Sequence, residues 1–168
     1  VVRATVSAPP PSTVPNRTLP YPAPPRSPRG ETMTLMQELL GSDAGRKRKL
    51  KAWDGRFLTA FNYKVFPAVW HGWRTYEQYW YFEQINDREV ALRSAHYGQY
   101  VGHSYSDHCN FASVAKEWEM LTPVKNDYDG SWSFKSRWGM YLTAHVSAQR
   151  NDCYFVKRNG RDQRWLLD

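Results

Sequence analysis

The sequence predicts an all-β domain, a β-trefoil built from three four-stranded repeats. One reason is a pattern that occurs three times: an apolar residue, a basic residue, a small residue, turn residues, glycine, any residue, an aromatic and an aliphatic. Its copies lie at residues 50–60, 92–102 and 134–144. They follow one another at about 40 residues, a period typical of repeat architectures. Finally, a tryptophan segment ends each copy, at residues 80–82, 118–120 and 165–167.

Each copy is expected to form four strands. The pattern predicts a hairpin, because its glycine supplies the positive φ that a tight turn requires and that costs other residues roughly 1–2 kcal/mol. Side chains alternate in the strand after the turn, so the aromatic faces one side and the aliphatic the other. These pairs are Phe57 and Leu58, Tyr100 and Val101, and Tyr141 and Leu142. Third strands are expected at residues 63–66, 109–112 and 152–156, and the tryptophan segments form the fourth.

One copy alone would leave an apolar face uncovered, whereas three copies around an axis bury it. The basic residue of each pattern, at Lys51, Arg93 and Lys135, follows an inward apolar residue and is expected to point outward. We therefore assign residues 46–168 to the trefoil. Residues 31–45 form a linker that can hold a short helix, and residues 1–30 form a disordered, proline-rich tail.

The tail carries nine of the eleven prolines and cannot form a packed core. It is expected to sample extended, polyproline-like states. The tail is interpreted either as a linker without a binding role or as a docking segment for SH3 or WW modules around Pro20–Pro28. The chain begins with Val1 rather than Met, which indicates a fragment or a processed form.

Two short segments precede the trefoil strands. Residues 32–40 predict a helix that Thr32 caps and Gly41 ends, either packed on the barrel or bound in a partner's groove. The basic run of residues 46–49 is either a solvated lead into the first strand or a nuclear localisation signal. A protein-interaction or nuclear scaffold module is one functional hypothesis that rests on this run and on the tail.

Charge and cysteine content set broad limits. The net charge is +7. More than half of the excess lies in the acid-free tail, so the trefoil is only mildly basic. Cys109 and Cys153 both fall in third strands, on different copies that need not be close. We expect two buried, reduced thiols and a reducing compartment. No apolar run reaches the length of a membrane span.

The sequence lacks the common catalytic motifs. The sequence has no glycine-rich phosphate loop and no hydrolase or metalloprotease motif. His103, His108 and Cys109 match no zinc spacing. Glu117 and Glu119 are expected on one exposed strand face, with nothing to raise a pKa. We therefore expect no enzyme, no metal and no cofactor. Nucleic-acid binding is not favoured either, because the core needs most of the aromatic residues.

Six motifs of the repeats, in order and spacing, resemble one domain of the fascin-like β-trefoil family. They begin with Gly55-Arg56-Phe57-Leu58-Thr59-Ala60 and end with Gly139-Met140-Tyr141-Leu142-Thr143-Ala144, so the resemblance covers about residues 46–168. Fascins bundle actin filaments, so the resemblance implies actin binding and a cytoplasmic, cytoskeletal location. Arg56 matches the family's basic residue ahead of its aromatic-Leu-Thr-Ala motif. The other basic residues that would face acidic actin are Lys49, Lys51, Lys64 and Arg74.

A lectin is the remaining hypothesis, since trefoils also serve as lectins. Gln78-Tyr79-Trp80 and Gln163-Arg164-Trp165 are similar to the Q-x-W of ricin-type repeats, in which these residues chiefly form the core. A sugar would stack on exposed aromatics in a long loop, and Trp70 and Trp73 are the candidates.

Overall fold

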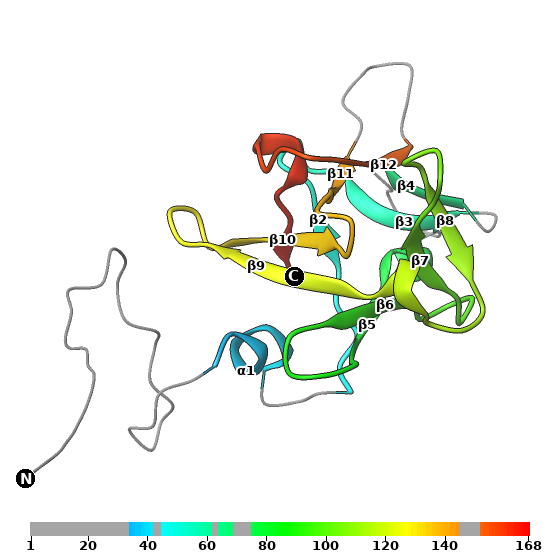
Figure 1. Cartoon of the computed structure of the whole chain (residues 1–168), viewed down its shortest axis with the longest axis horizontal. Helices are drawn as coiled ribbons and strands as arrows, with labels where there is room; N and C mark the ends of the chain where they lie inside the picture. The colour runs from blue at the N-terminus through cyan, green and yellow to red at the C-terminus, as the bar shows by residue number, and fades with distance from the viewer. Residues whose placement is uncertain (1–33, 42–44, 62–63, 69–74, 145–151) are drawn as a thin grey trace, which may run out of the picture. The chain divides into compact units, whose positions relative to one another are not determined.

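A computed structural model describes residues 34–41, 45–61, 64–68, 75–144 and 152–168 (Figure 1). The chain divides into two units, Val1–Thr34 and Leu35–Asp168. Every element described below belongs to the second unit. The proline-rich tail, with its predicted docking segment, lies outside the described residues.

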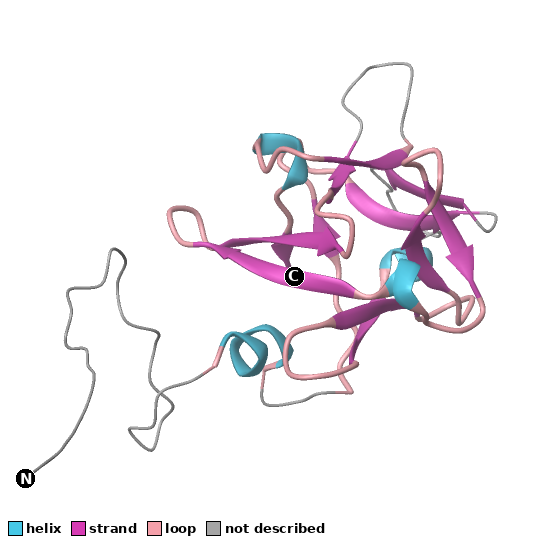
Figure 2. Cartoon of the chain, in the orientation of Figure 1, coloured by secondary structure: helices cyan, strands magenta, loops and turns pink. Residues whose placement is uncertain are grey.

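Strands dominate the second unit (Figure 2). The described residues form twelve strands: β2 (Leu50–Lys51), β3 (Phe57–Phe61), β4 (Lys64–Ala68), β5 (Trp80–Gln84), β6 (Val90–Ser94), β7 (Tyr100–His103), β8 (Cys109–Ala112), β9 (Leu121–Asn126), β10 (Ser131–Ser136), β11 (Tyr141–Ala144), β12 (Cys153–Val156) and β13 (Leu166–Leu167). Helix α1 (Leu35–Leu40) precedes them. Three 3-10 helices lie between strands: η1 (Thr75–Gln78), η2 (Glu117–Glu119) and η3 (Arg161–Gln163).

The strands repeat one pairing scheme three times. In each copy the first strand pairs with the second and the second with the third, as β2-β3-β4, β6-β7-β8 and β10-β11-β12. The fourth strand of one copy pairs with the first strand of the next, as β5-β6, β9-β10 and β13-β2. The last of these pairs closes the ring. Inside each copy the first strand also meets the fourth, at Arg48↔Trp80, Val90↔Leu121 and Trp132↔Trp165.

The predicted turns are confirmed. The glycines of the three hairpins have φ values of 90°, 74° and 78°, at Gly55, Gly98 and Gly139. These values lie in the left-handed region that side chains with a Cβ avoid. The alternation after each turn is also as expected. The aliphatic residues Leu58, Val101 and Leu142 are fully buried, whereas the aromatic residue before each of them is only partly buried.

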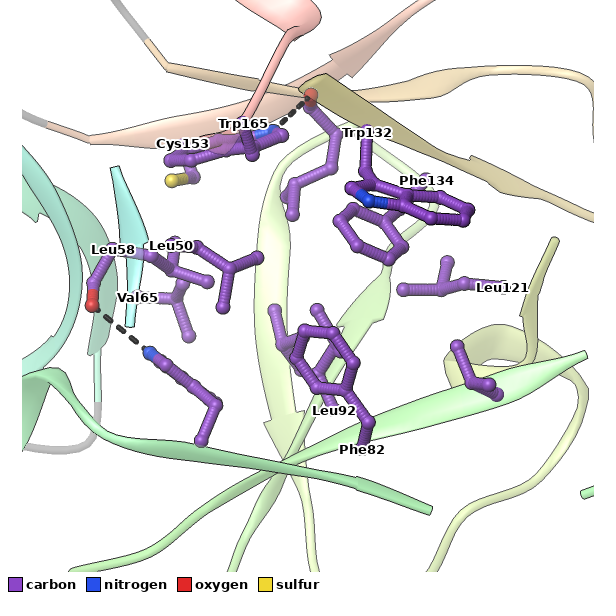
Figure 3. Packing of buried hydrophobic residues seen from close by; sticks show 14 of the residues in the cluster. Leu50, Leu58, Val65, Phe82, Leu92, Leu121, Trp132, Phe134, Cys153 and Trp165 are labelled. Carbon is purple, nitrogen blue, oxygen red and sulfur yellow. Dashed lines mark hydrogen bonds between the residues drawn. The ribbon is translucent and has the colours of Figure 1, made fainter. Parts of the chain in front are cut away.

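The core lies inside the ring of strands. Leu50, Leu58, Val65 and Phe82 from the first copy meet Leu92 from the second copy and Phe134 from the third (Figure 3). Two buried tryptophans also satisfy their indole N–H groups there. Trp80 Nε1 donates to the Leu58 carbonyl at 2.9 Å, and Trp165 Nε1 donates to the Leu142 carbonyl at 3.2 Å. These bonds remove the cost of burying a polar group.

Helix α1 is shorter than predicted and packs on the strands. It begins at Leu35, and the predicted cap Thr32 lies outside the described residues. Met36 and Leu39 are buried in the core, and Glu38 pairs with Lys125 of β9 at 2.7 Å. Gly41 follows the helix with a φ of 71°. Among the described helices, none has the length and apolarity to cross a membrane.

Candidate functional site

Three aromatic side chains lie together on the surface: Tyr105, Trp118 and Trp138. We call them the aromatic platform. The indoles of Trp118 and Trp138 stack with centroids 3.8 Å apart and planes 12° apart, and the Tyr105 ring lies 5.1 Å from Trp118. Tyr105 is 93% exposed and Trp138 44% exposed. Adjoining exposed aromatic rings are unusual on a surface with no binding role.

Three elements from two copies build this platform. Tyr105 lies in the turn between β7 and β8, Trp118 in η2, and Trp138 in the turn between β10 and β11. His103, at the end of β7, meets both indoles edge-on with centroids 5.9 Å away. Its ring stacks on Phe155 at 4.5 Å. His103 therefore joins the platform to the core.

His103 is also held by polar groups. Its Nδ1 lies 2.9 Å from Ser136 Oγ, and its Nε2 lies 2.7 Å from Asp107 Oδ1. Ser, His and Asp are the side chains of a hydrolase triad. However, Ser136 is buried at the end of β10, where its Oγ accepts a bond from Met140 N–H across the turn, and its repeat equivalent Ser94 accepts one from Tyr97 N–H. Ser136 thus closes a hairpin turn, as Ser94 does.

A polar pocket of about 490 Å³ lies at Arg137, which is next to the platform in sequence. Arg137, the residue before Trp138, lines it and donates two hydrogen bonds of 2.9 Å to the Glu89 carboxylate. These bonds hold the pKa of Glu89 below its ordinary value. Glu89, and to a smaller extent Glu117 beside Trp118, raise the pKa of the Arg137 guanidinium. The remaining lining residues are Asn86, Asp87, Arg88 and Thr122.

Trp118 does not lie in the strand that the sequence predicts for it. Residues 118–120 were expected to be the fourth strand of the second copy, but Trp118 lies in η2 and the strand begins at Leu121. Leu121 bridges Val90 just as Trp165 bridges Trp132, so Leu121 is the equivalent of the core tryptophans. Trp118 therefore lies outside the core and is partly exposed.

Glu117 and Glu119 were also expected on one exposed strand face, and that expectation is wrong. Both lie in η2, where Glu117 is exposed and Glu119 is buried. Burial raises the pKa of the Glu119 carboxyl above its ordinary value, although the hydrogen bond from Lys116 N–H partly opposes this rise. A raised pKa thus exists, contrary to the expectation from sequence.

The predicted actin-binding residues fall into different surroundings. Lys49 Nζ lies 5.0 Å from the Phe57 ring centroid and 5.2 Å from that of Tyr79. Lys47, which was not among the predicted contacts, lies beside it, with its Nζ 5.1 Å from the same Tyr79 ring. Lys51 is partly exposed on β2. Within the part of the chain that the structure describes, these three lysines form no ion pair. They make a basic strip along the start of the first copy.

Other candidates do not join this strip. Arg56 is mostly buried and its guanidinium pairs with Asp54 at 2.8 Å. Lys64 begins β4 opposite Phe61. Arg74 and the sugar-binding candidates Trp70 and Trp73 lie outside the described residues. The described residues also contain no group of three His, Cys, Asp or Glu residues arranged to hold a metal ion.

The glutamines of the two Q-x-W sequences are buried. Gln163 Nε2 donates to Thr143 Oγ1 at 3.0 Å, and Gln163 Oε1 accepts a bond from Gly160 N–H at 2.6 Å. Gln78 is fully buried at the equivalent position. Gln163 is therefore structural, whereas the buried Gln78 amide has no hydrogen-bond partner among the described residues.

Known structures, rather than known sequences, resemble this chain. No protein-family model and no curated protein matches this chain. Among solved structures, the designed three-fold symmetric protein ThreeFoil is similar with a TM-score of 0.62 and 20% identity, over 72% of this chain and 96% of that one. The chain is a β-trefoil.

Two further structures resemble this trefoil. SeviL bound to asialo-GM1 saccharide has a TM-score of 0.61 and 9% identity, over 73% of this chain and 95% of that one. The GlcNAcα1-4Gal-releasing endo-β-galactosidase from Clostridium perfringens has a TM-score of 0.62 and 18% identity. The match covers 72% of this chain but only 31% of that enzyme. These identities establish the fold alone, and membership of the fascin-like family stays a prediction.

Proposed function

We propose that this trefoil is a non-enzymatic carbohydrate-binding module and that the aromatic platform is its site. The observation that carries the proposal is the stack of the exposed Trp138 on the partly buried Trp118, beside the exposed Tyr105. Burial of an aromatic ring is favourable by roughly 1.5–3 kcal/mol, and these rings leave much of that area in water. A sugar ring presents a face of C–H groups that covers such an area and stacks on it.

Polar groups beside the platform favour the same ligand class. Binding sites for small polar molecules combine an apolar surface with a few hydrogen-bonding groups that fix orientation. The pocket supplies carboxylate, amide, hydroxyl and guanidinium groups, and one of its lining residues, Arg137, directly precedes Trp138. The hydroxyls of an oligosaccharide that extends from the platform would exchange hydrogen bonds with them.

The structural neighbours are consistent with this proposal. SeviL is described as bound to asialo-GM1 saccharide, and the clostridial enzyme as releasing GlcNAcα1-4Gal. Both names refer to glycans, and the second includes galactose. They guide the choice of probe.

A glycan array followed by titration calorimetry would test the proposal. We expect binding to galactose-containing oligosaccharides, with the asialo-GM1 saccharide as first probe. Trp138→Ala should weaken affinity at least tenfold. Tyr128→Ala removes an aromatic side chain that is 69% exposed and lies outside the platform, so it is the matched control. An array without any bound glycan, or equal affinity of Trp138→Ala and parent, would reject the proposal.

Actin-filament binding is a second proposal, and the basic strip favours it. Lys47, Lys49 and Lys51 carry charge without an ion-pair partner among the described residues, in the first copy where the fascin-like resemblance places the contact. Acidic surfaces attract such a strip at low ionic strength. The contribution of Arg56 is expected to be smaller, because Asp54 already neutralises it.

Co-sedimentation with actin filaments at low and physiological salt tests this second function. Binding should weaken with salt and with the double substitution Lys49→Glu and Lys51→Glu. Lys135→Glu changes the equivalent of Lys51 in the third copy and should leave binding unchanged. Absence of pelleting at low salt, or equal loss with Lys135→Glu, would exclude the strip as a filament site.

A further inference from the structure

The two cysteines of the chain face each other across two strands of different copies. Cys109 begins β8 and Cys153 begins β12. An antiparallel bridge joins His108 to Tyr154, and Phe155 N–H donates to the Asp107 carbonyl at 2.7 Å. The same register, continued by one residue, sets Cys109 directly opposite Cys153.

The pseudo-threefold axis explains this proximity. Cys109 and Cys153 pair with His103 and Ala144, and the equivalent residue of the first copy is Val65, which pairs with Ala60. The third strands β4, β8 and β12 contact one another pairwise. Equivalent positions near such an axis meet, although they are far apart in sequence. The sequence left open whether the two cysteines are close, and the structure places them opposite each other.

The local geometry suits a covalent bond. Directly opposite residues of an antiparallel pair have Cα atoms about 4.5–5.5 Å apart. A disulfide needs a Cα separation of about 4.4–6.8 Å. Cys153 is 2% exposed and Cys109 is partly buried against the same core. Burial, and then a hydrogen bond with the Cys109 thiol, raise the pKa of Cys153 well above its ordinary range.

We propose that Cys109 and Cys153 are a reversible dithiol–disulfide pair that links the second and third copies of the trefoil. Both are free thiols in this structure, which is the reduced form. The oxidant is a small disulfide of the glutathione class. A bond between β8 and β12 would close a loop that contains η2, β9, β10 and β11, and hence two members of the aromatic platform.

The exchange proceeds in two steps. Cys109 is the more exposed thiol, so its thiolate attacks the small disulfide, forms a mixed disulfide and expels one glutathione thiolate. Cys153 then loses its proton to solvent, and its thiolate attacks the Cys109 sulfur. The Cys109–Cys153 bond forms as the mixed disulfide breaks and the second glutathione leaves. Two protein thiols are oxidised, and one glutathione disulfide is reduced to two thiols.

Redox titration of the folded chain tests this inference. The chain is equilibrated with reduced and oxidised glutathione at graded ratios, then quenched for intact mass and thiol counting. We expect loss of both thiols, a mass decrease of about 2 Da and a melting temperature raised by roughly 10 °C, since a closed loop restricts the unfolded chain. Excess dithiol reductant should reverse all three changes.

Single variants separate the two steps. Cys153→Ala should stop at a glutathione adduct on Cys109, whereas Cys109→Ser should keep Cys153 as a free thiol in the folded state. The parent chain decides the question even if Cys153→Ala does not fold. A parent that keeps two thiols, stops at the glutathione adduct, forms only intermolecular disulfides or oxidises only in denaturant would overturn the inference.

Discussion

The carboxyl of Glu119 occupies the space that a side chain at Gly102 would need. A Cβ on Gly102 would lie within 3.0 Å of Glu119 Oε2. The third copy places Thr143 and Gln163 at the equivalent positions, where they hydrogen-bond at 3.0 Å. Lys116 N–H binds the Glu119 carboxyl just as Gly160 N–H binds the Gln163 amide. The two residues of each pair are therefore matched to each other.

Exchange of this pair should be strongly non-additive. Gly102→Thr alone forces Glu119 out of its buried position and should lower the free energy of unfolding by about 1–3 kcal/mol, which is typical of overpacking. Addition of Glu119→Gln recreates the pair of the third copy and should recover most of the loss. Urea unfolding of the two single variants and the double variant measures the coupling. Simple additivity would show that the two positions are independent.

Glu119 should also make stability depend on pH. In the unfolded chain a glutamate ionises near about pH 4.3, whereas burial raises the pKa of Glu119 in the fold. Between these two pKa values the folded state holds more protons than the unfolded state, so this residue's contribution falls as pH rises and is constant above the folded pKa. Relative to the parent, Glu119→Gln should therefore gain stability between pH 4 and pH 7. Denaturant unfolding at both values measures it, and a constant difference would contradict the raised pKa.

The turn at Gly139 should reject a β-branched residue for backbone reasons alone. Its φ is 78°, and a Cβ there would meet nothing within 4 Å. Gly139→Val should therefore cost about 1–2 kcal/mol or more through the left-handed backbone rather than through a clash. Gly139→Asn is the matched control, because asparagine tolerates this region better. Equal midpoints of unfolding for the two variants would show that the conformation is not required.

Loss of an indole hydrogen bond should be costly in two copies. Trp165→Phe leaves the Leu142 carbonyl without its indole donor and opens a cavity, and Trp80→Phe does the same at Leu58. Each change should lower the free energy of unfolding by about 1–3 kcal/mol. Trp53→Phe, at a position 41% exposed, is the control and should have little effect. A loss of unfolding free energy as small as that of Trp53→Phe would mean that these two hydrogen bonds do not contribute to stability.

Much of this fold was predictable from sequence because its repeats obey local rules. The glycine turns, the aromatic-aliphatic alternation and the third strands follow from φ restrictions and from the two-residue period of a strand. The fourth strand of the second copy was misplaced by three residues. Trp118 looked like the equivalent of Trp80, but packing at that position requires only a large apolar side chain, and Leu121 supplies it.

The aromatic platform could not be predicted, because its members come from two copies and lie in two turns and a 3-10 helix rather than in strands. Trp138 stands at a repeat position that Asp54 and Tyr97 occupy in the other copies, so the three copies differ there in residue type. Such a difference between copies is the one signal that could have drawn attention to it. The contact between Trp118 and Trp138 depends on how the copies pack, which the pattern within one copy does not contain.

The closing pair β13–β2 has a consequence for how the domain could be connected. Lys49 and Asp168 exchange both backbone hydrogen bonds, at 3.2 and 3.0 Å, so the two ends of the strand ring are joined side by side. The same ring of strands would therefore form if the chain began and ended at a different turn. A circularly permuted chain, opened at the exposed Asp129–Gly130 turn and joined across Lys49 and Asp168 by a flexible linker, would keep every strand pair.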